Sequence, residues 1–335
     1  MSRYVLTRIA STGLVLVGVS VLTFFIAHVV PADPVLAALG QHAREDQIQA
    51  YRHAYGLDQP VVVQYVQYMR RLAGGDLGLS IRTRRPVASD LAEFLPATVE
   101  LGSTAWLIAL LLGIPAGILS AIYKDRLADH LVRIAALAGA AMPVFWLGLL
   151  LLGSLYYRLH WLPGPGRLDL SIVPPPPRTG VLLIDSLLAA DGPAFANALR
   201  HLVLPGLTLG LFSTAVIARM TRSAMLEVLN QEYIRTARAK GLTRLRVLMH
   251  HALRNAMIPT LTVIGISFGN LLSGAVLTET VFAWPGLGRY ATASAVSLDF
   301  PAVMGVTLVV AVFYTLANLV VDLLYARVDP RIRYE

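Results

Sequence analysis

The stretch EYIRTARAKGLTRLRVLMHHALRNAMIP, residues 232–259, decides how this chain is interpreted. It gathers five arginines and one lysine around a single glycine, Gly241, although residues 201–218 before it and 256–278 after it contain no Asp, Glu, Lys or Arg. An arginine or lysine at the centre of a bilayer costs roughly 2.5 kcal/mol or more, so this stretch lies outside the hydrocarbon. A basic segment between two apolar ones predicts a loop that joins two membrane spans.

The whole chain has the composition of a membrane protein. Hydrophobic residues make up 56% of its 335 residues and charged residues only 14%, whereas soluble domains carry about 25% charged residues. Six apolar segments come close to or exceed the ~20 residues that a membrane-spanning helix needs. We therefore expect an all-α polytopic membrane protein with six transmembrane helices, at residues 9–31, 98–123, 134–157, 201–218, 257–280 and 300–322.

The basic residues predict the orientation of these spans. Sixteen of the 28 lysines and arginines lie in four segments that share one side of the membrane: residues 1–8, 124–133, 219–256 and 323–335. Loops rich in lysine and arginine remain in the cytoplasm, so both termini are predicted to be cytoplasmic and residues 32–97, 158–200 and 281–299 external. A cleaved signal peptide is a weaker interpretation of residues 9–31, whose apolar run exceeds the usual ~7–15 residues and precedes no A-x-A site.

The external segments have local signals of their own. Residues 59–75 have the apolar spacing of a short surface helix, and Ser89 or Asp90 is a candidate N-cap for the helix that leads into the second span. The proline run in residues 173–178 predicts a stiff extended spacer. Residues 281–299, interrupted by glycine and proline, are expected to dip back toward the membrane under a cover of protein.

The basic stretch itself predicts two short helices. Residues 228–240 lack helix breakers, Gly241 stands where a helix ends in a left-handed residue, and Thr243 can cap a second helix. We expect the first helix to project into the cytoplasm as a rigid knob, and the second to lie along the membrane or under the bundle until Pro259 opens the fifth span. The second helix has one predicted apolar stripe: Leu242, Leu245, Leu248, Met249, Ala252 and Leu253.

Several interpretations of this stretch remain open from the residues alone. The basic charge is explained equally well by a solvated loop and by a knob that docks a soluble partner. A helix-turn-helix that reads nucleic acid is disfavoured because the adjacent spans block access to a groove, so no nucleic acid partner is expected. His250 and His251 are poor metal ligands, since adjacent helical residues point to different faces, and no metal site is predicted.

The chain lacks the sequence features of an enzyme. A phosphate-binding loop needs Gly-x4-Gly-Lys-Ser/Thr, and the two lysines, Lys124 and Lys240, both lack that context. We therefore expect no ATP hydrolysis and no cofactor in this chain. An ion-coupled secondary transporter is the main alternative, but Glu279, Asp322 and His28 lie near span ends, where anchoring is the better interpretation. An intramembrane protease would need paired aspartates or a Ser–His pair.

The stretch resembles the cytoplasmic loop of ABC-importer permeases. Arg235-Thr236-Ala237 stands where that family has Glu-Ala-Ala, Gly241 matches its glycine, and Arg254 stands where many members have proline. Both departures resemble the dipeptide/oligopeptide/nickel branch, and the segment VPPPPRTGVLLIDSLL, residues 173–188, is similar to D,D-dipeptide permeases. Other motifs of this branch are GDLGLSIRTRRPV (75–87), FLPATVELG (94–102), MPVFWLGLLL (142–151), WLPGPGR (161–167), ARMTRSAMLE (218–227), TETVFAWPGLGR (278–289), DFPAVMG (299–305) and VDLLYARVDPRIR (321–333).

The resemblance implies a type I ABC-importer-like permease of the bacterial plasma (inner) membrane. Its partners would be the lipid bilayer, a homologous second permease subunit, an extracytoplasmic peptide-binding protein, and two ATPase subunits that bind the ATP and Mg. Di- or oligopeptides, among them D,D-dipeptides, are the implied substrates, and nickel chelates and glutathione are alternatives within the family. The substrate-binding residues are unknown, because no charge in the middle of a span is available to select a peptide terminus. The implied ATPase-coupling residues are Glu232, Tyr233, Arg235, Thr236, Ala237, Arg238, Lys240 and Gly241; Arg235, Arg238 and Lys240 could instead balance lipid phosphates.

Overall fold

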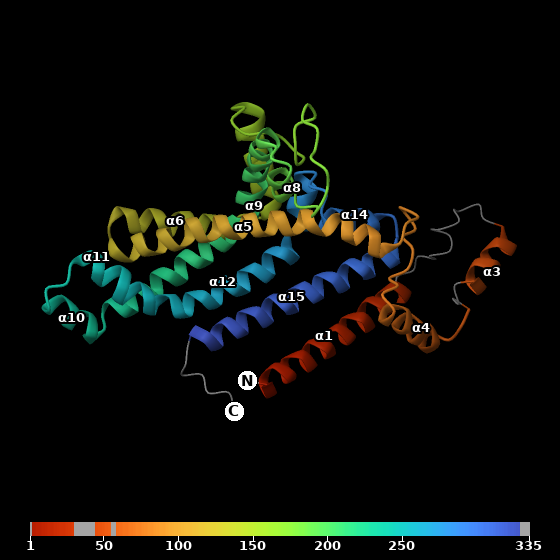
Figure 1. The fold of residues 1–335 in the computed structure, drawn as a ribbon, viewed down its shortest axis with the longest axis horizontal. Helices are drawn as coiled ribbons and strands as arrows, with labels where there is room; N and C mark the ends of the chain where they lie inside the picture. Colours follow the sequence, from red (N-terminus) through yellow and green to blue (C-terminus); the bar gives the residue numbers. More distant parts are fainter. Residues whose placement is uncertain (1, 30–43, 55–57, 329–335) are drawn as a thin grey trace. The chain divides into compact units, whose positions relative to one another are not determined.

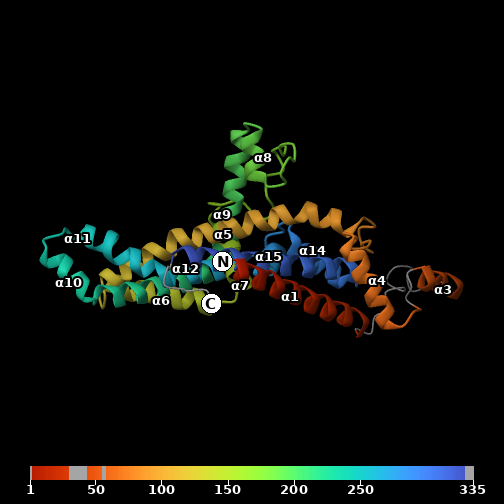
Figure 2. The same cartoon turned by 60° about the horizontal axis from the view of Figure 1, so that its bottom comes forward.

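A computed structural model describes residues 2–29, 44–54 and 58–328 of the chain, and the expected all-α class is confirmed for these residues (Figures 1 and 2). One isolated β-bridge, between Leu79 and Pro86, is the only extended pairing among them. The helices are α1 (Ser2–Val29), α3 (Glu45–Ala54), α4 (Val61–Ala73), α5 (Val87–Ile122), α6 (Leu127–Ala141), α7 (Val144–Leu151), the π-helix η1 (Leu152–Arg158), α8 (Leu182–Leu188), α9 (Gly192–Leu229), α10 (Glu232–Ala239), α11 (Arg244–Arg246), the π-helix η2 (Val247–Leu253), α12 (Arg254–Gly274), α13 (Val276–Val281), α14 (Leu287–Val296) and α15 (Phe300–Val328).

The chain packs as two compact units. The first comprises Met1–Thr98 and Pro285–Phe313, and the second comprises Val99–Trp284 and Tyr314–Glu335. In the first unit, α4 confirms the short helix predicted within residues 59–75, and α14 forms a partly buried helix in the predicted external segment 281–299. Its core joins the start of α5 to α14 and α15 through Val87, Leu91, Leu287, Tyr290, Ala302 and Val306.

Buried carboxylates hold the basic turn of the first unit, residues 76–86. Asp299, just before α15, accepts hydrogen bonds from the hydroxyl of Ser80 and from the backbone N–H of Arg82. A buried carboxylate needs such donors, because desolvating an unpaired charge is costly. The turn is therefore fastened to the beginning of α15.

Asp90 is the second buried carboxylate of this region. It accepts hydrogen bonds from the Thr83 hydroxyl at 2.6 Å and from the Tyr290 hydroxyl at 2.9 Å. Burial, together with the adjacent carboxylates, raises the pKa of Tyr290 to about 12, so this phenol stays protonated and remains a donor. The predicted N-cap role of Ser89 or Asp90 is wrong, since α5 already begins at Val87 and both residues lie inside its first turn.

Helix α9 is the element around which the second unit packs. Its 38 residues span about 57 Å at 1.5 Å per residue, far more than a bilayer requires. It begins after Asp191, whose carboxylate accepts a hydrogen bond from the N–H of Ala194 at 2.9 Å as an N-cap does. Helices α6, α7, α8 and α12 all pack against α9.

Two glycines let α5 and α9 approach each other closely. A Cβ atom at Gly210 of α9 would lie 2.6 Å from the carbonyl oxygen of Ala105 in α5. A Cβ atom at Gly117 of α5 would lie 2.6 Å from the carbonyl oxygen of Ala218 in α9. In a bilayer the hydrophobic effect does not drive helices together, so their association depends on close packing. Small residues at a helix contact allow the two backbones to come near enough for such packing. The two helices are thus packed backbone to backbone along this part of the unit.

The segment predicted as the third span, residues 134–157, is not one continuous helix. Helices α6 and α7 meet at 109° on either side of Met142 and Pro143. Proline lacks the N–H that would continue α6, and it pushes the preceding residue out of the α region. Met142 accordingly has ψ 131, an extended conformation.

Length and apolar composition identify membrane-spanning helices among the described residues. Three helices, Val87–Ile122, Gly192–Leu229 and Phe300–Leu319, can each cross a membrane, and the bent pair Leu127–Ala141 and Val144–Arg158 makes a fourth if it is one span. A shorter apolar helix covers Ser11–Ile26. The chain is therefore a multi-pass integral membrane protein, and its long helices extend beyond the predicted span limits.

We predict that Gly210→Ala lowers the thermal stability of the purified protein. Alanine improves helix propensity by about 1 kcal/mol, but the overpacking against the backbone of Ala105 costs about 1–3 kcal/mol. Gly153→Ala is the matched control, because no atom lies within 4 Å of its added methyl group. The apparent melting temperature in detergent should fall for Gly210→Ala and stay the same or rise for Gly153→Ala. Equal melting temperatures of the two variants would contradict the close approach of α5 and α9 at Gly210.

Candidate functional site

The knob predicted from the sequence corresponds to helix α10, which lies next to α11 at one end of the second unit (Figure 1). It begins at Glu232, because α9 continues to Leu229 and the chain turns through Asn230 and Gln231. Gln231 is extended, with ψ 149, which ends one helix before the next starts.

Gly241 closes α10 in the left-handed conformation that the sequence predicted. Its φ is +74°, its N–H donates to the carbonyl oxygen of Arg238 at 3.0 Å, and the N–H of Leu242 donates to the carbonyl oxygen of Ala237 at 3.4 Å. This pair of bonds is a Schellman motif, which satisfies the last carbonyl groups of a helix. A residue with a Cβ atom pays about 1 kcal/mol or more to adopt this φ, so glycine is suited to set the exit angle.

The inner face of α10 is apolar and packs on the chain itself. Ile234 is fully buried and Ala237 is 6% exposed. They lie three residues apart, hence on one side of the helix. Ala237, one of the coupling residues that the family resemblance implies, has its methyl group turned toward the core of this chain. The cluster around it contains Ala121, Ala224, Met225, Ile234, Ala237, Val247, Ala252 and Ala256.

The outer face of α10 is polar and exposed. Arg235 and Glu232 form an ion pair at 2.9 Å, but their side chains are 70% and 84% exposed, so the pair adds little to stability. The Thr236 hydroxyl donates to the carbonyl oxygen of Glu232 within the helix. Seven of the eight predicted coupling residues are therefore available at the surface: Glu232, Tyr233, Arg235, Thr236, Arg238, Lys240 and Gly241.

Tyr233 ties the knob to the helices that follow it. The side-chain amide of Asn255 donates to the Tyr233 hydroxyl oxygen at 2.6 Å and to the carbonyl oxygen of His251 at 3.2 Å. The Tyr233 hydroxyl in turn donates to the same carbonyl oxygen at 3.3 Å. These three bonds link α10 to η2 and α12, so a displacement of α10 is passed to the segment that leads into α12. Asn255 was not singled out from the sequence, since its partner lies 22 residues away.

The apolar stripe predicted after Gly241 is wrong in part. Leu245 and Met249 are exposed, whereas Val247, which the stripe omitted, is buried. The cause is η2, which is a π-helix over Val247–Leu253. Its hydrogen bonds run from i to i+5, so its turns are wider and residues at α-helical spacing no longer share a face.

Two further local predictions differ from the structure. Pro259 does not open the helix but lies inside α12, which starts at Arg254. Thr243 holds the N-cap position of α11 without a side-chain cap hydrogen bond. The ring centroids of His250 and His251 lie 5.3 Å apart, edge to face, and no group of three potential metal ligands occurs within the described part of the chain.

A buried ion pair, which the sequence did not reveal, joins three helices near the knob. The Nε and Nη2 atoms of Arg222 in α9 each donate to one carboxylate oxygen of Asp129 in α6 at 2.8 Å. The Ser120 hydroxyl of α5 and the N–H of Asp125 donate to the same carboxylate. We call this group the Asp129 clamp. Two parallel bonds from one guanidinium fix both position and orientation, which a single contact cannot do.

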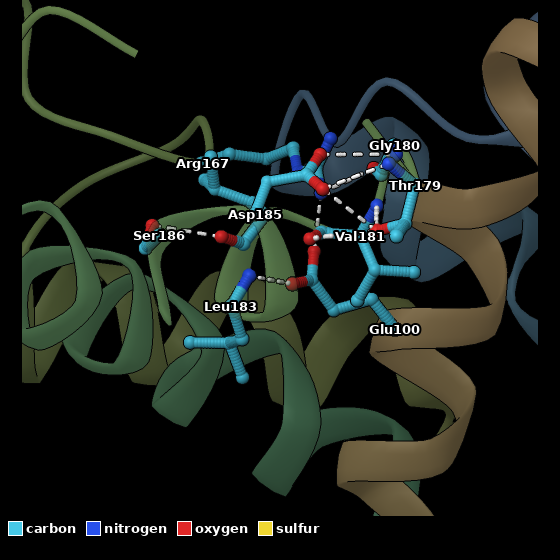
Figure 3. A network of polar contacts seen from close by, with 9 residues as sticks. Glu100, Arg167, Thr179, Gly180, Val181, Leu183, Asp185 and Ser186 are labelled. Carbon is cyan, nitrogen blue, oxygen red and sulfur yellow. Dashed lines mark hydrogen bonds and ion pairs between the residues drawn. The ribbon is translucent and has the colours of Figure 1, made fainter. Parts of the chain in front are cut away.

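The segment between η1 and α9, which is predicted to be external, has its own polar network (Figure 3). Glu100 of α5 accepts hydrogen bonds from the guanidinium of Arg167 and from the N–H of Leu183. The carboxylate of Asp185 accepts from the N–H and hydroxyl of Thr179 at 2.8 Å and from the N–H of Gly180 at 3.0 Å. Burial alone would raise the pKa of Asp185, but these donors hold it below its usual value.

Arg167 also brings two sequence motifs together. Its guanidinium lies 5.6 Å from the ring centroid of Trp284, within the range of a cation–π contact. The N–H of the adjacent Gly166 donates to the carbonyl oxygen of Phe282 at 2.9 Å. The motifs WLPGPGR and TETVFAWPGLGR, separated by more than a hundred residues, therefore meet within this unit.

We predict that Asp129→Asn destabilises the protein strongly. It removes the carboxylate that pairs with Arg222, and breaking a buried pair costs about 3–5 kcal/mol. Arg235→Gln is the control, because it breaks an exposed pair that contributes less than about 1 kcal/mol. Thermal unfolding in detergent should separate the two variants by several degrees. Similar melting temperatures would show that the Asp129 clamp does not hold the three helices.

Known families match almost the whole chain. Residues 113–334 match the family described as binding-protein-dependent transport system inner membrane component, and residues 1–102 match its N-terminal membrane component. A solved structure described as an amino acid ABC transporter with histidines aligns with a TM-score of 0.52 and 14% identity over 71% of this chain and 94% of that chain. At this identity the likeness concerns the fold alone.

Relatives of established description are much more similar in sequence. A probable D,D-dipeptide transport system permease protein of Escherichia coli strain K12 is 52% identical over 334 residues, which cover 99% of this chain and 98% of that protein. A di/tripeptide transport system permease protein of Pseudomonas aeruginosa strain UCBPP-PA14 is 47% identical over 319 residues, 95% of either chain. The chain thus belongs to the family of binding-protein-dependent transport system inner membrane components, the permeases of ABC importers, and within it to the dipeptide branch.

Proposed function

We propose that this chain is one permease subunit of an ATP-driven importer of di- or oligopeptides. Its near-complete alignment, at 52% and 47% identity, with two peptide permeases is the observation that carries the proposal. A homologous second permease subunit would complete the translocation pathway, and an extracytoplasmic binding protein would deliver the peptide. The 52% identity with a probable D,D-dipeptide permease favours D,D-dipeptides as the preferred substrates.

The proposed topology has six spans with both termini in the cytoplasm. Its support is the lysine and arginine content of the segments on the predicted inner side, together with the apolar helices found among the described residues. In this orientation α10 and α11 lie in the cytoplasm, and the network around Glu100 lies outside. The chain is then a multi-pass protein of the bacterial plasma membrane.

The proposed coupling surface is the exposed face of α10. Two separate ATPase subunits would bind ATP and Mg, and one of them would dock on Tyr233, Thr236 and Arg238. Tyr233 and Asn255 would pass the movement of α10 to α12, while the Asp129 clamp keeps α9 in register with α5 and α6. In this mechanism the chain's own residues bind the ATPase, orient α10 and transmit its movement to the spans, whereas the ATPases supply the energy.

Reconstituted transport tests the proposed activity. Proteoliposomes that contain this chain, its partner permease, both ATPases and the binding protein should accumulate D-alanyl-D-alanine only when ATP is supplied to the ATPase side. Accumulation should survive an uncoupler, because no ion gradient drives it. Uptake that collapses with the uncoupler, or that occurs without the ATPases, would favour the ion-coupled alternative.

Two substitutions on opposite faces of α10 test the coupling surface. Thr236→Trp should abolish uptake and leave thermal stability unchanged, because its side chain is exposed and a bulky ring blocks docking. Ala237→Trp should abolish uptake and also lower the melting temperature, since an indole cannot fit the buried cluster. Thr236→Val is the control of equal volume and should transport normally. Normal uptake by Thr236→Trp would remove this face from the docking site.

A further inference from the structure

Helix α4 packs on α1 and α15 within the first unit, and both ribbon views draw it beside the end of α1 (Figures 1 and 2). Phe24 of α1 stacks on Tyr68 with ring centroids 5.6 Å apart and meets Tyr65 edge to face at 5.3 Å. The hydroxyl oxygens of Ser20 and Tyr65 are 2.9 Å apart. Leu308 of α15 completes the buried cluster. Its tyrosines thus fix α4 against two apolar helices.

These contacts lie well inside the apolar segments of both neighbours. Leu308 is eight residues from Phe300, where α15 begins, which is about 12 Å along the helix axis. Ser20 is nine residues from Val29, where α1 ends, which is about 14 Å. Under the proposed topology both helix ends face outward. Two independent helices therefore place α4 about 12–14 Å below their outer ends, at the depth of the headgroup and outer acyl region rather than in open water.

The side of α4 next to these contacts is apolar and uncovered. Val62 is 74% exposed and Val66, one turn later, is 59% exposed. By helical spacing they lie on the flank beside Met69, which packs against the cluster around Phe24. Exposed apolar side chains are also present on α1, where Phe25, next to Phe24, is 59% exposed. Both helices that meet in the cluster around Phe24 therefore carry uncovered apolar side chains close to it.

The opposite side of α4 carries mostly polar side chains, although Val63, one turn before Gln67, is 41% exposed. Gln67 donates a hydrogen bond to the side chain of Gln59 at 2.8 Å, and Gln64 donates to its backbone carbonyl, also at 2.8 Å. Arg70 and Arg71 lie in the last turn with exposed side chains. An apolar flank, a glutamine side and terminal arginines are the features of a helix that lies in the plane of a membrane interface.

We propose that α4 is embedded in the outer leaflet of the bilayer, with Val62 and Val66 among the acyl chains and with Arg70 and Arg71 at the lipid phosphates. This placement concerns the membrane and not transport, and it depends on the proposed topology only for the choice of the outer over the inner leaflet. Lipid is the occupant because the exposed valines lie on a helix that is packed against two apolar helices at acyl depth, and because the arginines complement phosphate charge. The role of α4 is to anchor the external segment that follows it to the membrane plane.

Site-directed spin labelling tests this placement directly, because the chain contains no cysteine and single-cysteine variants need no altered background. Val62→Cys and Val66→Cys report on the proposed lipid flank, and Gln67→Cys is the matched control on the polar side of the same helix. The complete importer is reconstituted in vesicles of phosphatidylethanolamine and phosphatidylglycerol. Collision rates of each nitroxide are then measured with oxygen, which concentrates in acyl chains, and with a water-soluble nickel chelate.

The expected result is a reversal of accessibility across the helix. Oxygen should dominate at positions 62 and 66, and the nickel chelate should dominate at position 67. Dominance of the nickel chelate at position 66 would show an aqueous surface, and low accessibility to both reagents would show burial by a partner subunit; either overturns the proposal. ATP-driven uptake by the same vesicles, and labelling of Lys240 with an amine reagent that cannot cross the membrane, report separately on the proposed function and topology.

Discussion

The burial of Ile234 and Ala237 is the interaction that holds α10, the proposed coupling helix, in place. An isolated helix shorter than about 12–15 residues is marginal in water, and α10 has only 8 residues. Burying the isoleucine side chain contributes about 1.5–3 kcal/mol, which offsets part of the cost of ordering so short a helix. The Schellman turn at Gly241 then ends the helix where this contact ends. The knob is held in one orientation by the same packing that gives it its structure.

Two polar groups of different chemistry hold the knob and the helices near it. The hydrogen bonds between Tyr233, Asn255 and the backbone of η2 are directional and join α10 to α12. The Asp129 clamp is a desolvated ion pair that fixes the relative register of α5, α6 and α9. Because α9 also meets α5 backbone to backbone at Gly210, these helices have little freedom to slide past one another.

Buried carboxylates on the predicted external side are also paired with hydrogen-bond donors. Asp299, Asp90 and Glu100 are all nearly or fully buried, and each accepts a hydrogen bond from a residue far away in the sequence. Such carboxylates are costly unless bonded, so they fix the loops that supply the donors. The turns that hold these charges therefore adopt defined conformations at the ends of α5 and α15.

The sequence by itself determined the membrane class, the location of the basic loop and the left-handed glycine at its centre. These features depend on composition and on single-residue conformational preference, which are local properties. It also identified the family, since motifs spread along the chain resemble one branch. Residues 134–157 were predicted as one span because they are apolar and long enough, and that criterion takes no account of Pro143, where the helix breaks.

Only the tertiary structure decided which faces are buried and which residues meet. It turned Ala237 inward, exposed Leu245 and Met249 through a π-helical segment, and paired Asp129 with Arg222 across 93 positions of sequence. Hydrogen-bond partners so far apart produce no periodic pattern that a single sequence would reveal. A widened helical turn likewise reflects packing that no local propensity encodes, because the free energy of such contacts exists only once distant helices have come together.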